Sequence, residues 1–215
     1  MRISEIFKSI NGEGKFAGYP SIFIRTHGCN ISCSYCDSKY ACLGHDYTTM
    51  SITDIMSEVE KLNCNRITLT GGEPLIQAHS FELVGRLLDR GYLVEIETNG
   101  AVDISDLTNV VANELCTITM DWKCPSSGMN SRMIASNLGN LRDTDVLKCV
   151  VGSMDDLDEM NRVRMLTSAS VLVSPVFGKI DPKDIVKYLL DNDLNSVRFQ
   201  LQIHKFIWPA DMRGV

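Results

Sequence analysis

The sequence predicts an α/β protein built as one open, partial (β/α) barrel. Short apolar segments rich in β-branched residues alternate with segments whose apolar residues repeat at helical spacing. Repeated strand–helix units form a parallel sheet with right-handed crossovers. A complete eightfold barrel needs about 250 residues, and this shorter chain has room for roughly six or seven units. We therefore expect a single domain over residues 1–215.

Seven segments are predicted to be strands. Most of them are short, apolar and β-branched, which is typical of strands covered on both faces. They are Ser21–Thr26, Arg66–Thr70, Leu93–Thr98, Thr117–Asp121, Val146–Val151, Val171–Ser174 and Ser196–Gln202. In such sheets the chemistry lies where the carboxyl ends of the strands meet their loops, so motifs directly after a strand matter most.

Four helices are predicted between these strands, because a capping residue or a proline stands in front of apolar residues at helical spacing. The signals are Ser51 before Ile52–Leu62, Ser80 before Phe81–Arg90 with Gly91 as the stop, Ser153 before Leu157–Met160, and Asp181-Pro182 before Ile185, Tyr188 and Leu189. Each predicted helix lies between two predicted strands, which supports the strand–helix alternation.

Composition and charge exclude several classes of protein. Hydrophobic residues make up 44% of the chain and charged residues 22%, which argues against disorder. The formal net charge of −6 argues against nonspecific nucleic-acid binding, which needs clustered Lys and Arg. No apolar run approaches the roughly 20 residues of a membrane span, and the amino-terminal residues lack the long apolar stretch of a secretory signal. We expect a cytoplasmic protein with no nucleic-acid or membrane partner.

Eight cysteines in a chain without a secretory signal indicate reduced thiols or metal ligands rather than a disulfide framework. Cys29, Cys33 and Cys36 directly follow the first predicted strand, with the spacing Cys-x3-Cys-x2-Cys. Thiolates are the ligands of iron–sulfur clusters. Three ligands for four irons would leave one iron open to a substrate or cosubstrate. The cysteines with no shared spacing are assigned to core packing: Cys64, Cys116, Cys124 and Cys149.

Two other interpretations of the cysteine triplet stay open. Structural zinc needs four protein ligands, and only Cys42 and His45 lie near enough in the sequence to complete the set. Unliganded thiols packed in the core are the second alternative. The tight spacing on one loop favours an iron–sulfur cluster over both.

Together with Thr70-Gly71-Gly72-Glu73-Pro74 after the second predicted strand, the triplet resembles the radical S-adenosylmethionine (SAM) superfamily. Two glycines let backbone carbonyls approach the methionine ammonium of SAM, and Glu73 adds negative charge nearby. Further segments are similar to the 7-carboxy-7-deazaguanine synthases, from about residue 3 to the end. They are Glu5–Gly14, Gly18–Pro20, Phe23–Arg25, Cys36–Ser38, Glu97–Gly100, Met120–Lys123 and Gln202–Lys205. One departure is Asn11, where the family usually has Gln.

The resemblance implies an abbreviated α/β barrel with a [4Fe–4S] cluster on Cys29, Cys33 and Cys36, and SAM bound to the open iron. Cleavage of SAM would give a 5′-deoxyadenosyl radical that takes a hydrogen atom from the substrate. The implied reaction is ring contraction of 6-carboxy-5,6,7,8-tetrahydropterin to 7-carboxy-7-deazaguanine with loss of ammonia, a carbon–nitrogen lyase step toward 7-deazapurines such as queuosine. Mg²⁺, an electron donor such as flavodoxin and a homodimer are also implied, and Phe206–Trp208 is compatible with such a contact or with plain core.

The same resemblance assigns roles to individual residues. SAM contacts would fall on Tyr35, Cys36, Asp37, Gly72, Asp121, Trp122, Lys123, Ser174, Pro175, Val176 and Phe177. Ser38 would give a hydroxyl, a hard oxygen ligand, to Mg²⁺. Substrate contacts would fall on Ile10, Asn11, Gly12, Arg25 and Thr70, with Glu13 and His204 as weaker candidates. Arg25 can fork onto a carboxylate or make an ordinary surface salt bridge. Structural roles are assigned to His27, His45 and His79.

Two other functions stay open. A glycyl-radical activating enzyme would share the cysteine triplet and the Gly-Gly-Glu motif but would act on a protein chain. An electron-transfer or metal-storage protein would normally saturate its cluster with four protein ligands. The segment Ser9–Gly14 together with Arg25 suits a small carboxylated heterocycle and favours the synthase.

Overall fold

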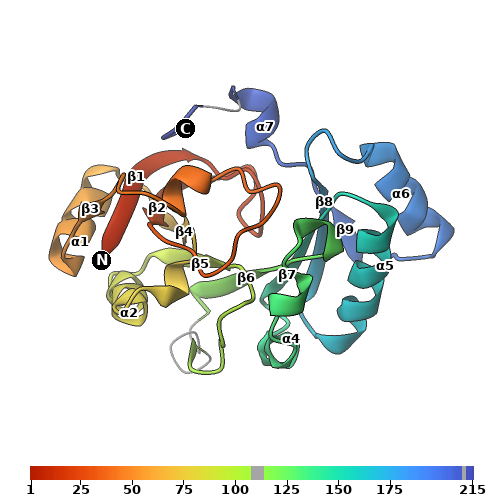
Figure 1. The fold of residues 1–215 in the computed structure, drawn as a ribbon. Coiled ribbons are helices and arrows are strands. Elements are labelled where there is room, and N and C mark those ends of the chain that lie inside the picture. Colours follow the sequence, from red (N-terminus) through yellow and green to blue (C-terminus); the bar gives the residue numbers. More distant parts are fainter. Residues whose placement is uncertain (108–113, 210–211) are drawn as a thin grey trace.

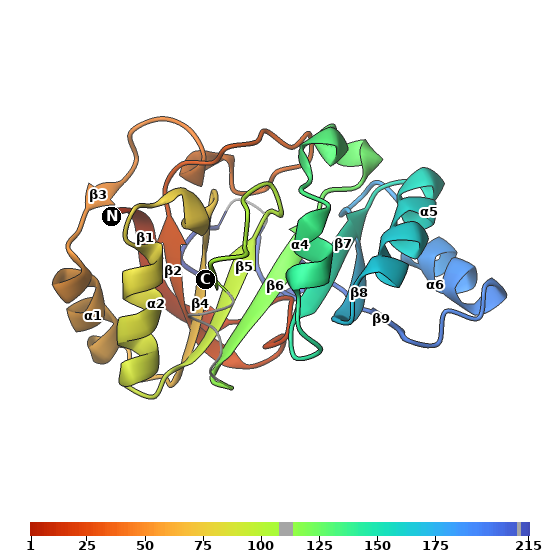
Figure 2. The same cartoon turned by 90° about the horizontal axis from the view of Figure 1, so that it is seen from below.

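The computed structural model describes residues 1–107, 114–209 and 212–215 of the chain. Its strands form one nine-stranded sheet in the order β3-β1-β2-β4-β5-β6-β7-β8-β9, and Figure 2 shows them side by side. From β2 to β9 every neighbouring pair is parallel. The strands are β1 (Arg2–Ile10), β2 (Pro20–Thr26), β3 (Thr48–Thr49), β4 (Arg66–Gly71), β5 (Leu93–Thr98), β6 (Cys116–Trp122), β7 (Val146–Val151), β8 (Ser170–Pro175) and β9 (Val197–Phe199).

Among the described residues, five helices lie along the outside of this curved sheet, and a sixth, α7, lies near the carboxyl terminus (Figure 1). They are α1 (Ile52–Lys61), α2 (Ser80–Asp89), α4 (Ser136–Asn140), α5 (Met154–Val163), α6 (Pro182–Asp191) and α7 (His204–Ile207). Single 3₁₀ turns occur at Lys39–Ala41, Pro74–Ile76, Pro125–Ser127, Asn130–Arg132 and Arg164–Leu166. The predicted alternation of strand and helix is confirmed, and so is the partial (β/α) barrel.

The predicted caps explain where the helices begin. The Ser51 hydroxyl accepts a hydrogen bond from the backbone N of Asp54 at 3.1 Å, and Ser153 caps α5 in the same way. Asp181 accepts from the backbone N of Lys183 at 2.9 Å, with Pro182 at the first helical position. Ser80 differs from the prediction, because it lies inside α2 and its hydroxyl donates to the carbonyl oxygen of Pro74.

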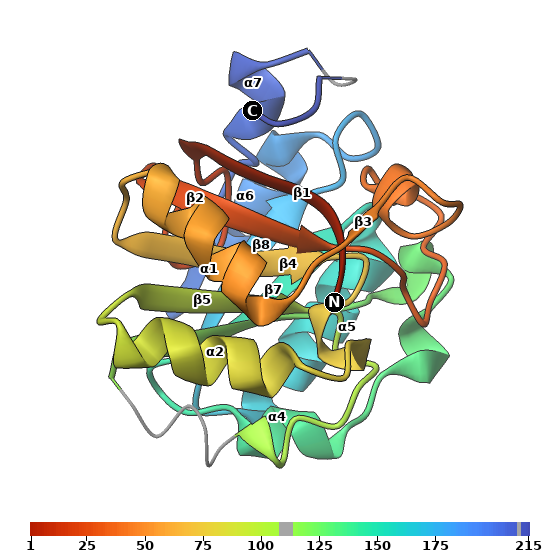
Figure 3. The same cartoon turned by 90° about the vertical axis from the view of Figure 1, so that its left-hand side faces the viewer.

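Two strands were missed by the sequence prediction, β1 and the two-residue β3. β1 pairs antiparallel with β2, with Ile6 opposite Ile24, and the short β3 pairs antiparallel with β1 (Figure 3). β1 is mostly half-buried, and its apolar residues are separated by Ser, Glu and Lys, so it lacks the continuous apolar run of the other strands. One end of the otherwise parallel sheet is therefore antiparallel.

Other differences lie at element ends. The last strand covers only Val197–Phe199 rather than Ser196–Gln202. Past its end, the Gln200 side chain is bonded to the backbone of Gly14, accepting from its N at 2.8 Å and donating to its O at 3.1 Å. This contact ties the end of β9 to the loop after β1, while the backbone N of Gln200 still donates to the carbonyl oxygen of Val173 in β8 at 2.9 Å. The predicted helix at Leu157–Met160 is longer at both ends, and α4 was not predicted.

Side chains of the central strands alternate between two shielded faces. The outward set is apolar and packs beneath the helices: Ile67, Leu69, Val94, Ile96, Ile118, Met120, Trp122, Leu147, Cys149, Val171 and Val173. The inward set is mostly polar although buried or half-buried: Thr68, Thr70, Glu95, Glu97, Thr117, Thr119, Asp121, Lys148 and Ser174. The expectation of strands that are apolar on both faces is therefore wrong for the inner face.

All eight cysteines are free thiols, as expected for a chain without a disulfide framework. Of the four assigned to packing, Cys116, Cys124 and Cys149 are buried, and Cys64 is half-buried. Across the ranges that the structure describes, no helix has the length and hydrophobicity needed to pass through a bilayer.

Candidate active site

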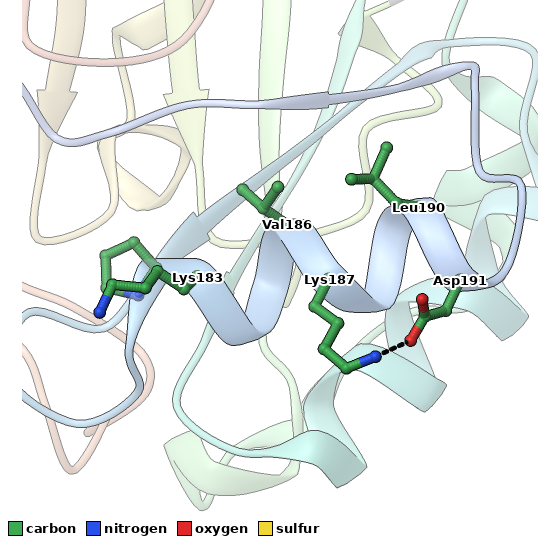
Figure 4. Close-up of a pocket in the computed structure, with 6 residues that line it drawn as sticks. Lys183, Val186, Lys187, Leu190 and Asp191 are labelled. Carbon is green, nitrogen blue, oxygen red and sulfur yellow. Dashed lines mark hydrogen bonds and ion pairs between the residues drawn. The ribbon is translucent and has the colours of Figure 1, made fainter.

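A cleft of about 920 Å³ lies at the carboxyl ends of the parallel strands. Its floor is the polar inner face of the sheet, and its rim includes the end of β1, the cysteine loop and the carboxyl-terminal segment. A second hollow of about 420 Å³ lies on the outer face of α6 (Figure 4). It is lined by Pro182, Lys183, Val186, Lys187, Leu190 and Asp191, none of which was predicted to take part in chemistry. The predicted site residues gather in the first cleft instead.

The cysteine loop after β2 carries Cys29, Cys33 and Cys36 to one rim of this cleft. Cys42 lies against them, with its Sγ 3.9 Å from Cys36 Sγ. Hydrogen bonding with Cys42 lowers the pKa of Cys29 to about 6 and that of Cys36 to about 7. Because the thiolate is the form that binds metal, these thiols fit an iron–sulfur cluster.

Zinc does not fit the same residues. Within the described parts of the chain, no three His, Cys, Asp or Glu side chains converge on a single metal ion. Neither His45 nor Cys42 lines the cleft. His27 and His79 also lie outside the lining, and His27 Nδ1 instead meets Ser4 Oγ at 3.0 Å.

The Gly-Gly-Glu-Pro segment packs against the cysteine loop. A Cβ atom at Gly72 would lie 2.2 Å from the carbonyl oxygen of Gly28, so only glycine permits this approach. Glu73 is fully buried, and it accepts hydrogen bonds from Thr98 Oγ1 at 2.9 Å and from the backbone N of Asn99 at 2.6 Å. Burial raises its pKa to about 7. Glu73 therefore ties two loops together and does not line the cleft as expected.

Most of the predicted SAM contacts lie in the cleft lining: Tyr35, Cys36, Asp37, Gly72, Asp121, Lys123, Val176 and Phe177. Asp121 Oδ2 is 2.9 Å from Lys123 Nζ. Burial opposes ionisation of Asp121, but Lys123 and Lys148 lower its pKa below the usual range. Asp121 Oδ1 and Ser174 Oγ are buried polar atoms without a hydrogen-bond partner among the described residues. Such atoms fit a polar ligand at this wall, because buried polar groups are normally paired.

Trp122, Ser174 and Pro175 do not line the cleft, and Ser174 is buried behind its wall. Strand alternation explains Trp122, because Asp121 faces inward and the next side chain must face outward. Its indole Nε1 donates to Glu159 Oε1 at 2.9 Å on the outer side. Trp122 can therefore reach a ligand only through its backbone.

All five predicted substrate contacts line the cleft: Ile10, Asn11, Gly12, Arg25 and Thr70. Arg25 Nε is 2.7 Å from Glu5 Oε1, which also accepts from Tyr40 Oη at 2.6 Å. This ion pair uses only Nε, so the two terminal nitrogens can meet a carboxylate. His204 packs against Gly12, where a Cβ atom would lie only 2.0 Å from His204 Nδ1. His204 also lines the cleft.

Asn11, the fifth predicted contact, is only 1% exposed. Its Nδ2 donates to Thr68 Oγ1 at 3.0 Å and to Glu95 Oε2 at 3.1 Å. Its Oδ1 accepts from the backbone N of Glu13 at 3.3 Å. Although Asn11 borders the cleft, its amide nitrogen bonds to residues inside the barrel, and its amide oxygen bonds to the backbone of the loop after β1.

Ser38 and Asp37 lie side by side at the rim. Ser38 Oγ donates to Asp37 Oδ1 at 3.1 Å, and Lys205 forms an ion pair with Asp37. Burial raises the pKa of Asp37, but Lys205 outweighs it and lowers the value to about 2. A hydroxyl beside a permanently ionised carboxylate is a hard-oxygen pair, which is the donor type that Mg²⁺ prefers.

Several cleft residues were missed or left without a role. Burial raises the pKa of Glu97 to about 7, and Thr70 Oγ1 donates to Glu97 Oε2 at 2.8 Å. Lys148 lies on the floor, and it could have been found as the lone charge in the apolar strand Val146–Val151. The remaining lining residues include Glu5, Phe7, Phe23, Tyr40, Thr98, Asn99, Val150, Lys179, Gln202 and Lys205.

The carboxyl-terminal segment also lines the cleft, through Trp208, Pro209 and residues 212–215. Arg213 lies over the Tyr40 ring at 3.9 Å and pairs with Asp46 at 2.7 Å. No local sequence pattern marks these residues, because the contacts join segments far apart in the chain.

Comparisons with known proteins agree with this geometry. The profile of the radical SAM superfamily matches residues 23–127. A protein of Clostridium acetobutylicum named 7-carboxy-7-deazaguanine synthase is 43% identical, and the alignment covers 100% of this chain and 99% of that protein. A protein of the same name from Methanospirillum hungatei is 42% identical over 96% of this chain and 85% of its own length.

Solved structures show the same fold. QueE from Escherichia coli matches with a TM-score of 0.76 at 20% identity, covering 94% of both chains. SuiB from Streptococcus suis, solved bound to S-adenosylmethionine, matches with a TM-score of 0.63 at 12% identity, covering 82% of this chain and 48% of that one. Radical SAM enzymes use a [4Fe–4S] cluster and SAM. The full-length relatives show that this chain belongs to the 7-carboxy-7-deazaguanine synthase family of radical SAM enzymes.

Proposed function

We propose that this chain converts 6-carboxy-5,6,7,8-tetrahydropterin to 7-carboxy-7-deazaguanine with loss of ammonia, as one radical SAM domain over residues 1–215. The observation that carries the proposal is that the cysteine triplet and Arg25 line the same cleft. A metal-binding rim and a guanidinium suited to a carboxylate thus lie at the same end of β2, where Arg25 is followed four residues later by Cys29. The product would serve 7-deazapurine biosynthesis of the queuosine type.

Cys29, Cys33 and Cys36 would hold the [4Fe–4S] cluster, which together with SAM supplies a carbon-centred radical that removes a hydrogen atom from the substrate. Asp121 and Ser174 would bind SAM through their unpartnered oxygens. Tyr35, Asp37, Gly72, Lys123, Val176 and Phe177 would line its site, with Trp122 and Pro175 contributing backbone only. These residues would orient the nucleotide and exclude water.

The opposite side of the cleft would bind the pterin. Arg25, held by Glu5 and Tyr40, would bind the substrate carboxylate through its terminal nitrogens. Thr70 and Glu97 form a polar pair on the floor that can meet the edge of the heterocycle. Ile10 and Gly12 would cover one face of the ring, while Asn11 would shape their loop.

Mg²⁺ is proposed at Ser38, whose hydroxyl lies beside the Asp37 carboxylate. Ser38 and Asp37 would hold such an ion, which would supply positive charge for the substrate carboxylate. We also propose a cytoplasmic homodimer that receives electrons from a donor such as flavodoxin. Phe206 is 63% exposed and packs edge-on to Phe177 at 6.0 Å, so this apolar surface is available for a subunit contact rather than part of the core.

The test of the proposed function is anaerobic incubation of the reconstituted protein with SAM, Mg²⁺, a reductant and carboxytetrahydropterin. Mass spectrometry should show 7-carboxy-7-deazaguanine. A reconstituted protein that forms no product, or whose cluster spectrum is unchanged by SAM, would contradict the proposal. The second outcome would favour an electron-transfer protein.

Arg25 separates the synthase from an enzyme that activates a protein substrate. Arg25→Ala should lower kcat/KM for the pterin about a hundredfold or more, because a charge-assisted contact to the carboxylate is lost. Arg25→Lys should restore part of the loss, since it keeps the charge without the fork. Equal activity of all three proteins would indicate that no carboxylate is bound there.

A further inference from the structure

Lys148 is the one charged residue of β7, and its side chain is only 6% exposed. It points to the inner face and lines the floor of the cleft. Its Nζ lies 3.2 Å from Glu13 Oε2 and 3.4 Å from Asp121 Oδ2. None of the roles assigned above uses this ammonium group.

The two partners of Lys148 belong to different halves of the cleft. Glu13 lies in the loop after β1, on the side of the proposed pterin site, and Gln202 Nε2 donates to it at 3.2 Å. Asp121 ends β6 on the side of the proposed SAM site and also pairs with Lys123. A line of alternating charges therefore runs across the floor, and Lys148 is the only member of it that contacts both halves.

Burying a lysine is unfavourable unless its charge is paired. Burial lowers the pKa of Lys148, but Glu13, Asp121 and Glu97 outweigh this and raise it well above the usual value. These carboxylates therefore favour the charged form of the ammonium group. Removing it would leave Glu13 with a single amide donor, free to turn, and would add unbalanced negative charge beside Glu97.

We propose that Lys148 is a positioning residue that fixes the carboxylates of Glu13 and Asp121 relative to each other and so aligns the pterin half of the cleft with the SAM half. This role rests on the proposed function, because it requires a ligand bound against Glu13. Lys148 need not contact a reacting atom. Its effect is carried by the two ion pairs.

The test compares Lys148→Met, Lys148→Arg and Lys15→Met with the wild type. Lys15 is the control, because its ammonium also contacts the inner face of the sheet, donating to Thr117 Oγ1 at 2.7 Å, but the residue is exposed and does not line the cleft. Binding of 7-carboxy-7-deazaguanine to the reconstituted, SAM-loaded and unreduced enzyme is measured by anaerobic calorimetry. Lys148→Met should weaken binding about tenfold or more, Lys148→Arg should stay within about threefold, and Lys15→Met should match the wild type.

Kinetics and a double variant complete the test. Lys148→Met should raise KM for the pterin more than it lowers kcat, since it loosens binding rather than the chemical step. Adding Glu13→Gln to Lys148→Met should weaken binding little further, because the two residues act as a pair. Where Lys148→Met does not fold, Glu13→Gln alone should show the same loss of affinity and Lys148→Arg should keep it.

Three results would overturn the role of Lys148. They are wild-type affinity in Lys148→Met, an equal loss in Lys15→Met, and additive losses in the double variant. If the wild type neither binds this product nor converts the pterin, the proposed function fails together with the inference. Wild-type binding with an unaffected Lys148→Met variant overturns the inference alone.

Discussion

The outer and inner faces of the central sheet are both shielded from water, yet they carry opposite chemistry. On β6 the outward Ile118 is fully buried among apolar side chains, while its inward neighbour Thr119 donates to a carboxylate oxygen of Glu95. The same backbone therefore holds a hydrophobic core on one side and a charged cleft on the other. The comparison teaches that burial alone does not identify a core residue in this fold. Outward substitutions should affect stability alone, whereas inward ones should also affect binding and chemistry.

The largest expected effect comes from replacing one cysteine on each face of the sheet by alanine. Cys33→Ala at the cleft rim should abolish the [4Fe–4S] cluster, because thiolates hold its irons. Cys149→Ala on the outward face of β7 should keep the cluster and cost about 1 kcal/mol of stability. Iron analysis and visible absorption after anaerobic reconstitution measure the difference. A normal cluster in Cys33→Ala would show that the rim does not bind it.

A second pair of variants tests neighbouring positions on β6. Ile118→Ala should lower the free energy of unfolding by about 3 kcal/mol, because it leaves a cavity beneath the helices, with KM unchanged at a temperature where the variant is folded. Thr119→Val keeps the shape but removes a donor from buried Glu95, at a cost of about 1–3 kcal/mol. Denaturant titrations report both. A larger loss in Thr119→Val would mean that polar contacts, not apolar packing, dominate the barrel.

A smaller effect is expected in how stability depends on pH, through the titration of Glu97 on the inner face. The pKa of Glu97 is raised from 4.5 to about 7 by burial, so the folded protein favours the neutral carboxyl. The stability that this group contributes is present below its unfolded pKa and is lost as the pH rises toward about 7. Glu97→Gln stays neutral, so its melting temperature should rise relative to the wild type between pH 5 and pH 8 on the order of a few degrees. A constant difference would mean that Glu97 does not titrate in this range.

The smallest expected effect concerns the rim outside the sheet. Ser38→Ala should weaken stimulation by Mg²⁺ several-fold without changing cluster content, because a hydroxyl ligand is one of several oxygens around this ion. The control is Ser34→Ala, since Ser34 Oγ donates to the carbonyl oxygen of Ser126 and does not line the cleft. Unchanged Mg²⁺ dependence in Ser38→Ala would contradict the assignment.

Features set by local sequence were predictable. The capping residues Ser51 and Asp181 and the spacing of Cys29, Cys33 and Cys36 each act within a few residues. Features set by distant contacts were not. The contact between Lys148 and Glu13 joins positions 135 residues apart (148 − 13). The amphipathic β1 lacked the continuous apolar run by which the other strands were recognised.

The inner face also shows why residue types alone mislead. Asn11 and Glu73 were expected near ligands because their segments resemble the motifs of the family, and the side chains of both instead make internal hydrogen bonds. Lys148 was overlooked because its strand is otherwise apolar. A buried polar residue can serve the framework or the ligand, and only its partners in space decide which.

The lack of a side chain at Gly72 determines how strongly a substitution at this position would affect catalysis. Two main-chain segments meet there with no room for a methyl group, so the spacing between the cysteine loop and the end of β4 depends on a rigid backbone contact instead of adjustable side chains. A Gly72→Ala change would force these segments apart by a fraction of an ångström to an ångström. Misplacement on this scale can cost about two orders of magnitude in rate.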